Sequence, residues 1–159
     1  MKRLLVLRHA KAEQESDSGR DFDRPLAEHG WKDATEVGRK MRERGLDPDA
    51  VIASPAKRVV ETLAGLAEGY GPLDTDYDQR IYNASPETLL DVVRGADDGA
   101  QTLLLVGHNP GLHYLLLDLT HDEVGESFPT AALAVVDLAV ASWADADRAS
   151  GKLVDLILR

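Results

Sequence analysis

Two arginines and two histidines each stand at or just beyond the end of an apolar run, namely Arg8, His9, Arg58 and His108. A guanidinium fork can contact two oxygens of one phosphate, and a neutral imidazole nitrogen is a nucleophile. A histidine held between arginines is therefore suited to accept a phosphoryl group. Each signal is weak alone, because a charge at a strand end is often a surface residue and a single histidine is often structural. Their shared position is what points to chemistry.

The apolar runs that precede these residues are predicted to be strands of one sheet. Leu4 to Leu7, Val51 to Ala53 and Leu103 to Val106 are continuous in apolar residues, as expected for strands covered on both faces. A further short strand is expected near residues 74–78. In open α/β sheets, ligands bind outside the carboxyl ends of the strands, so we expect the polar segments to converge on one rim.

Helices are predicted between the strands. Trp31, Ala34, Val37 and Met41 recur at helical spacing, with Gly45 ending that helix. Ser54-Pro55, Ser85-Pro86 and Asn109-Pro110 are predicted to start the later helices, with a capping residue before a proline. The positive ends of the helices after Ser54 and Asn109 would add to the attraction for an anion.

The end of the chain departs from this alternation. Ala131 to Val140 and Leu153 to Leu158 are two strand-like runs with no helix between them, and they are expected to be neighbouring or antiparallel strands. Strand and helix alternate elsewhere, which predicts an α/β protein. The expected architecture is a three-layer α/β/α sandwich with a mostly parallel central sheet. No linker divides the chain, so residues 1–159 are expected to form a single domain.

Composition excludes several classes of function. The 159 residues are 43% hydrophobic and 29% charged, with a formal net charge of -10 and no cysteine. Disulfides, thiolate metal sites and a cysteine nucleophile are therefore excluded. An acidic domain is a poor binder of nucleic acid or of an anionic membrane. A phosphate substrate would be repelled by the overall field, so local cations must attract it.

The first residues predict a cytoplasmic protein. Met1-Lys2-Arg3 is basic, but the apolar run that follows ends at Arg8. A secretory signal needs about 7–15 apolar residues and a membrane span needs about 20. The run is better explained as a short buried strand.

The motifs around these residues resemble those of the histidine phosphatase superfamily, which also contains the cofactor-dependent phosphoglycerate mutases. The matching segments are Leu7-Arg8-His9-Ala10-Lys11, Asp21-Phe22-Asp23-Arg24-Pro25-Leu26, Ser54-Pro55-Ala56-Lys57-Arg58 with Thr62, Tyr82-Asn83-Ala84-Ser85-Pro86-Glu87, Val106-Gly107-His108-Asn109-Pro110-Gly111 and Phe128-Pro129-Thr130-Ala131-Ala132. They cover essentially the whole chain, in order. In detail they are similar to the small SixA-type phosphohistidine phosphatases, which implies a single histidine phosphatase domain of phosphoglycerate mutase-like fold.

The resemblance implies a role for each residue. His9 would attack phosphorus and become the phosphohistidine, while Arg8 and Arg58 would bind the non-bridging oxygens. His108 would donate a hydrogen bond to the same phosphoryl group, and Arg24 is a further candidate for contact with phosphate. Phosphoryl transfer asks a protein mainly for positioning and electrostatic stabilisation, which agrees with this set of side chains. No cofactor and no metal are expected.

The general acid is the one element that the sequence does not place. Many relatives carry a glutamate, before the second histidine, that protonates the leaving oxygen. Asp78 and Glu87 are the candidates here, but either is also explained as a surface or helix-start residue. An alkoxide needs a proton on leaving, whereas an imidazole leaves a phosphoramidate more easily. The missing acid therefore favours protein phosphohistidine as the substrate.

Three alternatives remain open at this point. The chain could be a general small-molecule phosphomonoesterase of the same superfamily, or a non-catalytic module that binds phosphate or a phosphoprotein. It could also be a scaffold whose matches are accidental, although the order of the motifs argues against this. A phosphorylated protein or a small phosphate ester is the expected partner, with no nucleic acid and no membrane. The oligomeric state is left undetermined.

The other histidines carry less weight. His29 is expected at the surface and His113 on a helix face. His121 precedes Asp122 and Glu123, but this spacing fits no standard metal motif.

Overall fold

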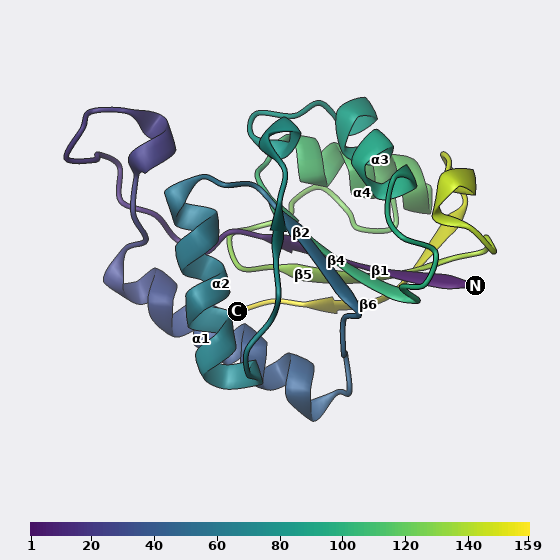
Figure 1. Cartoon of the computed structure of the whole chain (residues 1–159), viewed down its shortest axis with the longest axis horizontal. Coiled ribbons are helices and arrows are strands. Elements are labelled where there is room, and N and C mark those ends of the chain that lie inside the picture. Colours follow the sequence, from purple (N-terminus) through teal and green to yellow (C-terminus); the bar gives the residue numbers. More distant parts are fainter.

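The computed structural model describes residues 1–159, which form a six-stranded sheet with helices on both faces (Figure 1). In space the strands follow the order β3-β2-β4-β1-β5-β6. The pairs β1–β4, β2–β4 and β2–β3 are parallel, whereas β5 is antiparallel to both β1 and β6. The strands are β1 (Lys2–Arg8), β2 (Ala50–Ala53), β3 (Asp76–Tyr77), β4 (Thr102–Gly107), β5 (Leu133–Leu138) and β6 (Gly151–Ile157).

Four α-helices cover the two faces of this sheet. They are α1 (Glu28–Glu43), α2 (Lys57–Tyr70), α3 (Pro86–Arg94) and α4 (Gly111–Thr120), and short 3-10 helices span Asp21–Asp23, Gln79–Ile81 and Trp143–Asp145. Side chains of a strand point alternately to its two faces. Leu5 and Leu7 of β1 accordingly pack in the core beneath α1 and α2, while Leu4 and Val6 pack beneath α3 and α4. The predicted three-layer, mostly parallel architecture is confirmed.

The weaker strand predictions are also confirmed. The short strand expected near residues 74–78 is β3, which adds two residues to the parallel edge of the sheet. The two final runs are β5 and β6, which pair antiparallel. β5 lies against β1, so the chain's late segments border the residues that follow β1.

The order of the strands places the residues after β1 and β4 side by side. Arg8 at the end of β1 is in register with Gly107 at the end of β4, and His9 N–H donates to the Gly107 carbonyl at 3.1 Å. The chain then leaves β1 towards the α1 face and leaves β4 towards the α4 face. A crevice between neighbouring strands whose connections diverge in this way is where α/β sheets bind ligands.

One predicted helix start is wrong. Ser54-Pro55 does not cap α2, which begins at Lys57 with no side-chain cap. The Ser54 hydroxyl instead accepts from the Ala56 N–H at 3.2 Å and bonds to His108. The predicted start at Ser85-Pro86 is confirmed, because Ser85 caps α3 and accepts from the Thr88 N–H. The Asn109 side chain accepts from the His113 N–H at the start of α4.

A glycine of α1 allows the loop after β1 to pack against that helix. A Cβ atom at Gly30 would lie 2.1 Å from the Lys11 carbonyl oxygen, closer than any real contact. The same carbonyl accepts from the Ala27 N–H at 2.9 Å, just before α1 begins. The backbone beyond His9 is therefore held in place by close contact with the helix.

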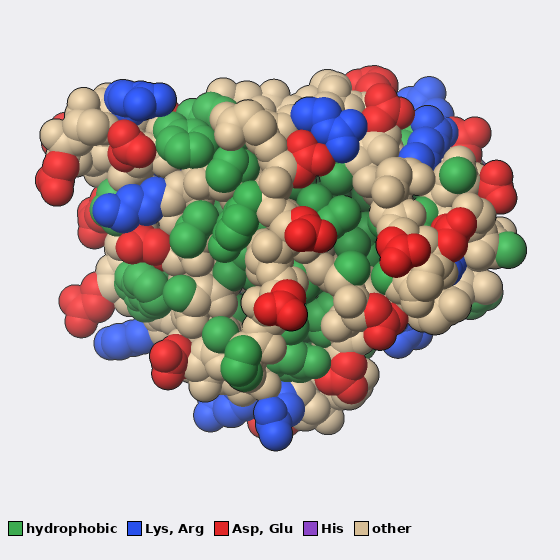
Figure 2. Space-filling view, viewed as in Figure 1, with side chains coloured by type: hydrophobic (Ala, Val, Ile, Leu, Met, Phe, Trp, Pro, Cys, Tyr) green, Lys and Arg blue, Asp and Glu red, His purple; other side chains and the backbone are tan.

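The surface reflects the acidic composition. Figure 2 shows acidic side chains spread over the visible face, with basic side chains mostly towards its edges. None of the helices has the length and apolar character that crossing a bilayer requires.

Candidate active site

The structure brings the four predicted residues together at the carboxyl ends of β1, β2 and β4. The His9 and His108 rings lie with their centroids 5.3 Å apart. Both histidines are 8% exposed and Arg58 is 5% exposed, so these polar groups are almost removed from bulk solvent. Arg8 is partly buried beside them. Their roles in catalysis stay predictions, but the geometry on which those roles depend is present.

One hydrogen bond fixes the tautomer of His9. Its Nδ1 lies 2.7 Å from the Ala10 carbonyl oxygen. A carbonyl can only accept a hydrogen bond, so Nδ1 carries the proton. Nε2 is then left with a free lone pair, which is the state that a nucleophile needs.

A hydrogen bond to Ser54 fixes the tautomer of His108. Nε2 of His108 lies 2.8 Å from the Ser54 hydroxyl, which is fully buried. The Ser54 oxygen already accepts from the Ala56 N–H, and Nε2 is the one acceptor within reach of its own proton. This arrangement favours donation from Ser54 to Nε2, which puts the imidazole proton on Nδ1. Nδ1 can then donate to an anion.

Backbone segments from distant parts of the chain hold these residues. The Phe128 carbonyl accepts from Arg8 Nη1 at 3.2 Å and from Asn109 Nδ2 at 2.7 Å. The Ala131 N–H donates to the carbonyls of Arg8 and His9, each at 3.1 Å. The site is thus braced by the segment that leads into β5.

Thr62 of α2 joins the segments that follow β1 and β2. Its hydroxyl accepts from the Ala10 N–H at 3.0 Å and donates to the Arg58 carbonyl at 2.6 Å. The hydroxyl is fully buried. The backbones that carry His9 and Arg58 are therefore held at a fixed separation.

Asp21 is a site residue that the sequence reasoning did not single out. Its Oδ2 accepts from Arg58 Nη2 at 3.1 Å and from the Tyr82 hydroxyl at 2.6 Å. Its Oδ1 accepts from Arg24 Nη1 at 2.9 Å, and its carbonyl accepts from Arg58 Nη1. Arg24, a predicted phosphate contact, is thus tied to Asp21. The only signal in the sequence was the position of Asp21 in the motif that precedes Arg24.

Three buried nitrogens of this cluster have no hydrogen-bond partner in the protein. They are Nε of Arg8, Nε of Arg58 and Nδ1 of His108. Buried donors are nearly always satisfied, and leaving one unpaired costs about 1–3 kcal/mol. Three such atoms on the side chains around His9 are what a site for an anion would provide.

Burial and the neighbouring guanidinium charges keep both histidines neutral. Burial, then the charges of Arg58, Arg8 and Arg24, lower the pKa of His9 to about 4, against the opposing effect of its bond to Ala10. Burial, followed by the charge of Arg58, lowers the pKa of His108 to about 3. Tyr82 and the neighbouring arginines hold the pKa of Asp21 well below its ordinary value. At neutral pH the cluster therefore presents three guanidinium groups, two neutral imidazoles and one carboxylate.

These shifts predict that mild acid destabilises the protein. Between its pKa of about 4 in the folded state and the ordinary value of 6.5, His9 binds more protons when the chain is unfolded. His108 acts in the same direction, so the free energy of unfolding falls as the pH is lowered through this window. For His9 alone the loss is on the order of 3 kcal/mol once the pH is below both values. Urea unfolding at a series of pH values between these limits measures it.

His9→Gln is expected to flatten this pH dependence, because the titrating ring is gone. His29→Gln is the matched control, since the His29 side chain is 66% exposed and pairs only with Asp33. An unchanged slope in His9→Gln would contradict the assignment of His9 as a buried neutral group.

Neither candidate general acid joins the cluster. The Asp78 carboxylate is bound by the Arg80 guanidinium at 2.7 Å, and that contact lowers its pKa. Glu87 lines a separate surface hollow of about 240 Å³ with Arg94 and Asp118. No hydrogen bond or ion pair links Asp78 or Glu87 to His9 or His108. Neither carboxylate is therefore placed to donate a proton at the cluster.

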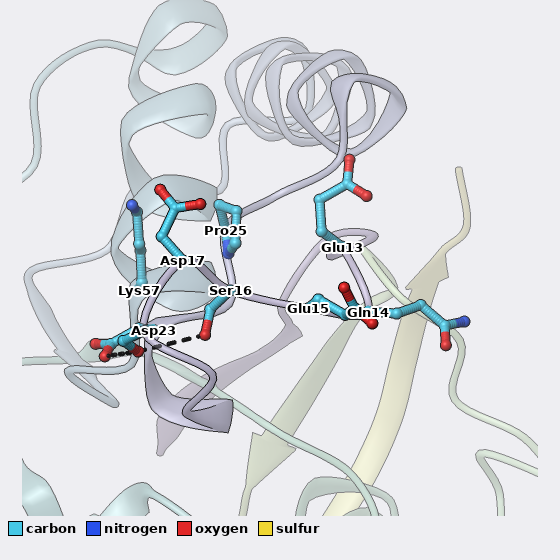
Figure 3. A pocket seen from close by; sticks show the side chains of 9 residues that line it. Glu13, Gln14, Glu15, Ser16, Asp17, Asp23, Pro25 and Lys57 are labelled. Atoms are coloured by element: carbon cyan, nitrogen blue, oxygen red, sulfur yellow. Dashed lines mark hydrogen bonds between the residues drawn. The ribbon is translucent and has the colours of Figure 1, made fainter.

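Another hollow, of about 590 Å³, has a lining that does not suit phosphate. Figure 3 shows the loop side chains that line it; they include four carboxylates, Glu13, Glu15, Asp17 and Asp23, and one cation, Lys57. An anion is repelled by such a lining. Elsewhere, no group of three or more histidine or carboxylate side chains is arranged to hold a metal ion.

The sequence matches a known protein family. The family described as the histidine phosphatase superfamily (branch 1) matches residues 4–85. That range contains Arg8, His9, Asp21 and Arg58. An uncharacterised protein of Mycobacterium tuberculosis is 33% identical over 159 residues, which cover 93% of this chain and 96% of that protein.

Solved structures give a closer view of the architecture. The provisionally named phosphohistidine phosphatase SixA of Agrobacterium tumefaciens is 30% identical, with a TM-score of 0.85 over 99% of this chain and 98% of that one. The provisionally named SixA of Nakamurella multipartitia is 27% identical, with a TM-score of 0.85 over 99% and 95% of the two chains. The predicted fold and the predicted family resemblance are both confirmed.

Proposed function

The chain belongs to the histidine phosphatase superfamily, and from this membership we propose that it hydrolyses phosphohistidine on a protein through a covalent intermediate on His9. Phosphatase is the coarse class of activity that goes with the family. The substrate and the individual steps are inferred from the geometry of the site.

In the proposed reaction, Nε2 of His9 attacks phosphorus while the leaving group departs from the opposite side. The proton stays on Nδ1 throughout and donates to the Ala10 carbonyl, so the phosphorylated ring is a cation whose N–H has a hydrogen-bond acceptor. Arg8, Arg58 and His108 would hold the three non-bridging oxygens. Water then attacks the phosphohistidine and releases inorganic phosphate.

The observation that carries this proposal is the set of unpaired nitrogens on Arg8, Arg58 and His108 beside the free Nε2 of His9. Positive charge and fixed donors around a nucleophile are what phosphoryl transfer requires, since charge spreads over the oxygens in the transition state. A partly desolvated cluster strengthens these interactions, which lets them outweigh the acidic surface.

The choice of substrate is supported by the carboxylates of the site. Asp78 is neutralised by Arg80, Glu87 is elsewhere, and Asp21 has a lowered pKa. None of them is suited to protonate a departing alkoxide. An imidazole needs no such proton if its other nitrogen is already protonated. The likeness to two proteins named as phosphohistidine phosphatases supports the same choice.

A substrate panel tests the proposal. The purified chain is incubated in the presence of EDTA with a protein phosphorylated on histidine and, separately, with sugar and glycerate phosphates. We expect loss of the phosphohistidine signal with release of phosphate, and much slower turnover of the monoesters. Rapid turnover of the monoesters, with the phosphohistidine protein left intact, would exclude the proposed substrate. Activity that is lost when EDTA is added, and is present without it, would exclude a metal-independent reaction.

Ser54→Ala is expected to lower kcat by about ten-fold, because a lost buried hydrogen bond of about 1–3 kcal/mol no longer fixes the His108 tautomer. Nitrogen NMR of the His108 ring should show the proton shared between Nδ1 and Nε2, where the native protein carries it on Nδ1. Ser54→Thr keeps the hydroxyl and is expected to retain both properties. A variant with alanine that keeps the native tautomer and turnover would remove Ser54 from this role.

A further inference from the structure

A second hollow lies beside the cluster of Arg8, His9, Arg58 and His108. It has a volume of about 370 Å³ and is lined by Arg20, Asp21, Phe22, Gln79 and Tyr82. The Phe22 and Tyr82 rings meet edge to face, with centroids 5.1 Å apart. The Tyr82 ring also lies 5.6 Å from the His108 ring. This space is called the rim hollow below, and two of its lining residues contact the cluster: Tyr82 lies beside His108, and Asp21 bonds to Arg58.

Asp21 can accept one further hydrogen bond into the rim hollow. A carboxylate has about four lone-pair positions. Oδ2 of Asp21 uses two for Arg58 and Tyr82, whereas Oδ1 uses one for Arg24. The side chain is 49% exposed and lines the rim hollow, so the carboxylate has capacity for a further donor. Its partners also hold the carboxylate in a fixed orientation.

We propose that the rim hollow receives the imidazole ring of the substrate phosphohistidine, and that Asp21 accepts the N–H of the ring nitrogen remote from phosphorus. This inference rests on the proposed function. The flat ring would lie against the Phe22 and Tyr82 side chains, where aromatic contacts favour it. Its positive charge, present when the remote nitrogen is protonated, would face the Asp21 carboxylate.

The reaction step balances without a proton donor from the protein. The bond between phosphorus and the substrate nitrogen breaks, and its electron pair stays on that nitrogen. A new bond forms between phosphorus and Nε2 of His9. The substrate ring leaves as neutral imidazole, still carrying the proton that bonds to Asp21. Asp21 stays ionised, so it stabilises the protonated ring and thereby improves the leaving group.

An alkoxide leaving group would gain nothing comparable. Asp21 carries no proton to give, and a negative charge developing on oxygen would be repelled by the carboxylate. Asp21 therefore favours an imidazole leaving group and disfavours an alkoxide. The contact between Asp21 and Arg58 affects all substrates alike. An effect of Asp21 that differs between the two leaving groups can therefore be measured separately from that contact.

Asp21→Asn tests the inference with two substrates, a phosphohistidine peptide and p-nitrophenyl phosphate. We expect kcat/KM for the peptide to fall by at least about ten-fold more than kcat/KM for the aryl ester, because the lost charged hydrogen bond acts on the imidazole leaving group alone. Asp23→Asn is the matched control. Asp23 belongs to the same short helix, but its carboxylate bonds to the Ser18 hydroxyl and lies in the acidic hollow.

Phe22→Ala is a second test that leaves the charges in place. It removes one wall of the rim hollow and should also reduce turnover of the peptide more than that of the aryl ester. Equal losses on both substrates, in both variants, would overturn the inference while leaving the proposed function intact. A native protein that hydrolyses the aryl ester but not the peptide would overturn both. Thermal unfolding of each variant confirms that the comparison is made on folded protein.

Discussion

His9→Ala is expected to reduce phosphatase turnover by at least about a thousand-fold, because loss of a nucleophile leaves only binding and electrostatic effects. The reason lies in one nitrogen. Nε2 has a free lone pair because Nδ1 donates to the Ala10 carbonyl at 2.7 Å, and no other imidazole of the cluster has this arrangement. Stopped-assay measurement of kcat with a phosphohistidine protein and with an aryl phosphate gives the size of the effect.

Acid-labile labelling of the protein provides the second readout for His9. After brief incubation with labelled substrate and rapid quenching, the native protein should carry one labile phosphoryl group, and His9→Ala should carry none. His29→Ala is the control, since the exposed His29 lies on α1 and pairs only with Asp33. A phosphorylated intermediate that persists in His9→Ala, for example on His108, would show that the nucleophile has been misidentified.

Arg58→Ala is expected to lower kcat/KM by about a hundred- to a thousand-fold, the effect of removing one fixed donor from a developing anion. Arg58 is 5% exposed, holds Asp21 through two nitrogens and has a third nitrogen unpaired. Its removal also takes away a charge that lowers the pKa of both histidines. The His9 and His108 rings should therefore titrate at higher pH in this variant.

Arg58→Lys separates charge from geometry. A lysine restores one positive charge but cannot contact two oxygens with a planar fork, so we expect an intermediate loss of about ten-fold. Lys57→Ala is the matched control, because Lys57 is the neighbouring residue of α2 and is exposed to solvent. Inhibition by vanadate should weaken in parallel with kcat/KM. Native affinity for vanadate in Arg58→Ala would place the anion away from this arginine.

The fold was readable from the sequence because its strands are covered on both faces. Continuous runs such as Leu4 to Leu7 leave little alternative to a buried parallel strand, and helix starts such as Ser85-Pro86 are local chemistry. The same rule about strand ends predicts, from the sequence alone, that Arg8, His9 and His108 lie close together. These inferences depend on short-range pattern and on one general property of α/β sheets.

The remaining features depend on contacts between segments that are far apart along the chain. Ser54 has the signature of a helix cap, but its hydroxyl is needed by His108, which lies in another segment, and α2 starts later. Asp21 sits in a polar loop that is typical of a solvated surface. Only the folded chain places it against Arg58 and Tyr82. The tautomers of the two histidines likewise depend on partners that spacing does not reveal.

The hydrogen bond between His9 and the Ala10 carbonyl has an energetic consequence for the proposed pathway. Donor and acceptor in the first step are both imidazoles, each with its far N–H supported by an oxygen. One P–N bond is therefore replaced by another of similar free energy, and the first step is close to reversible. The free energy is released only when water cleaves the enzyme-bound phosphoramidate, so that single hydrolytic event gives the whole cycle its direction.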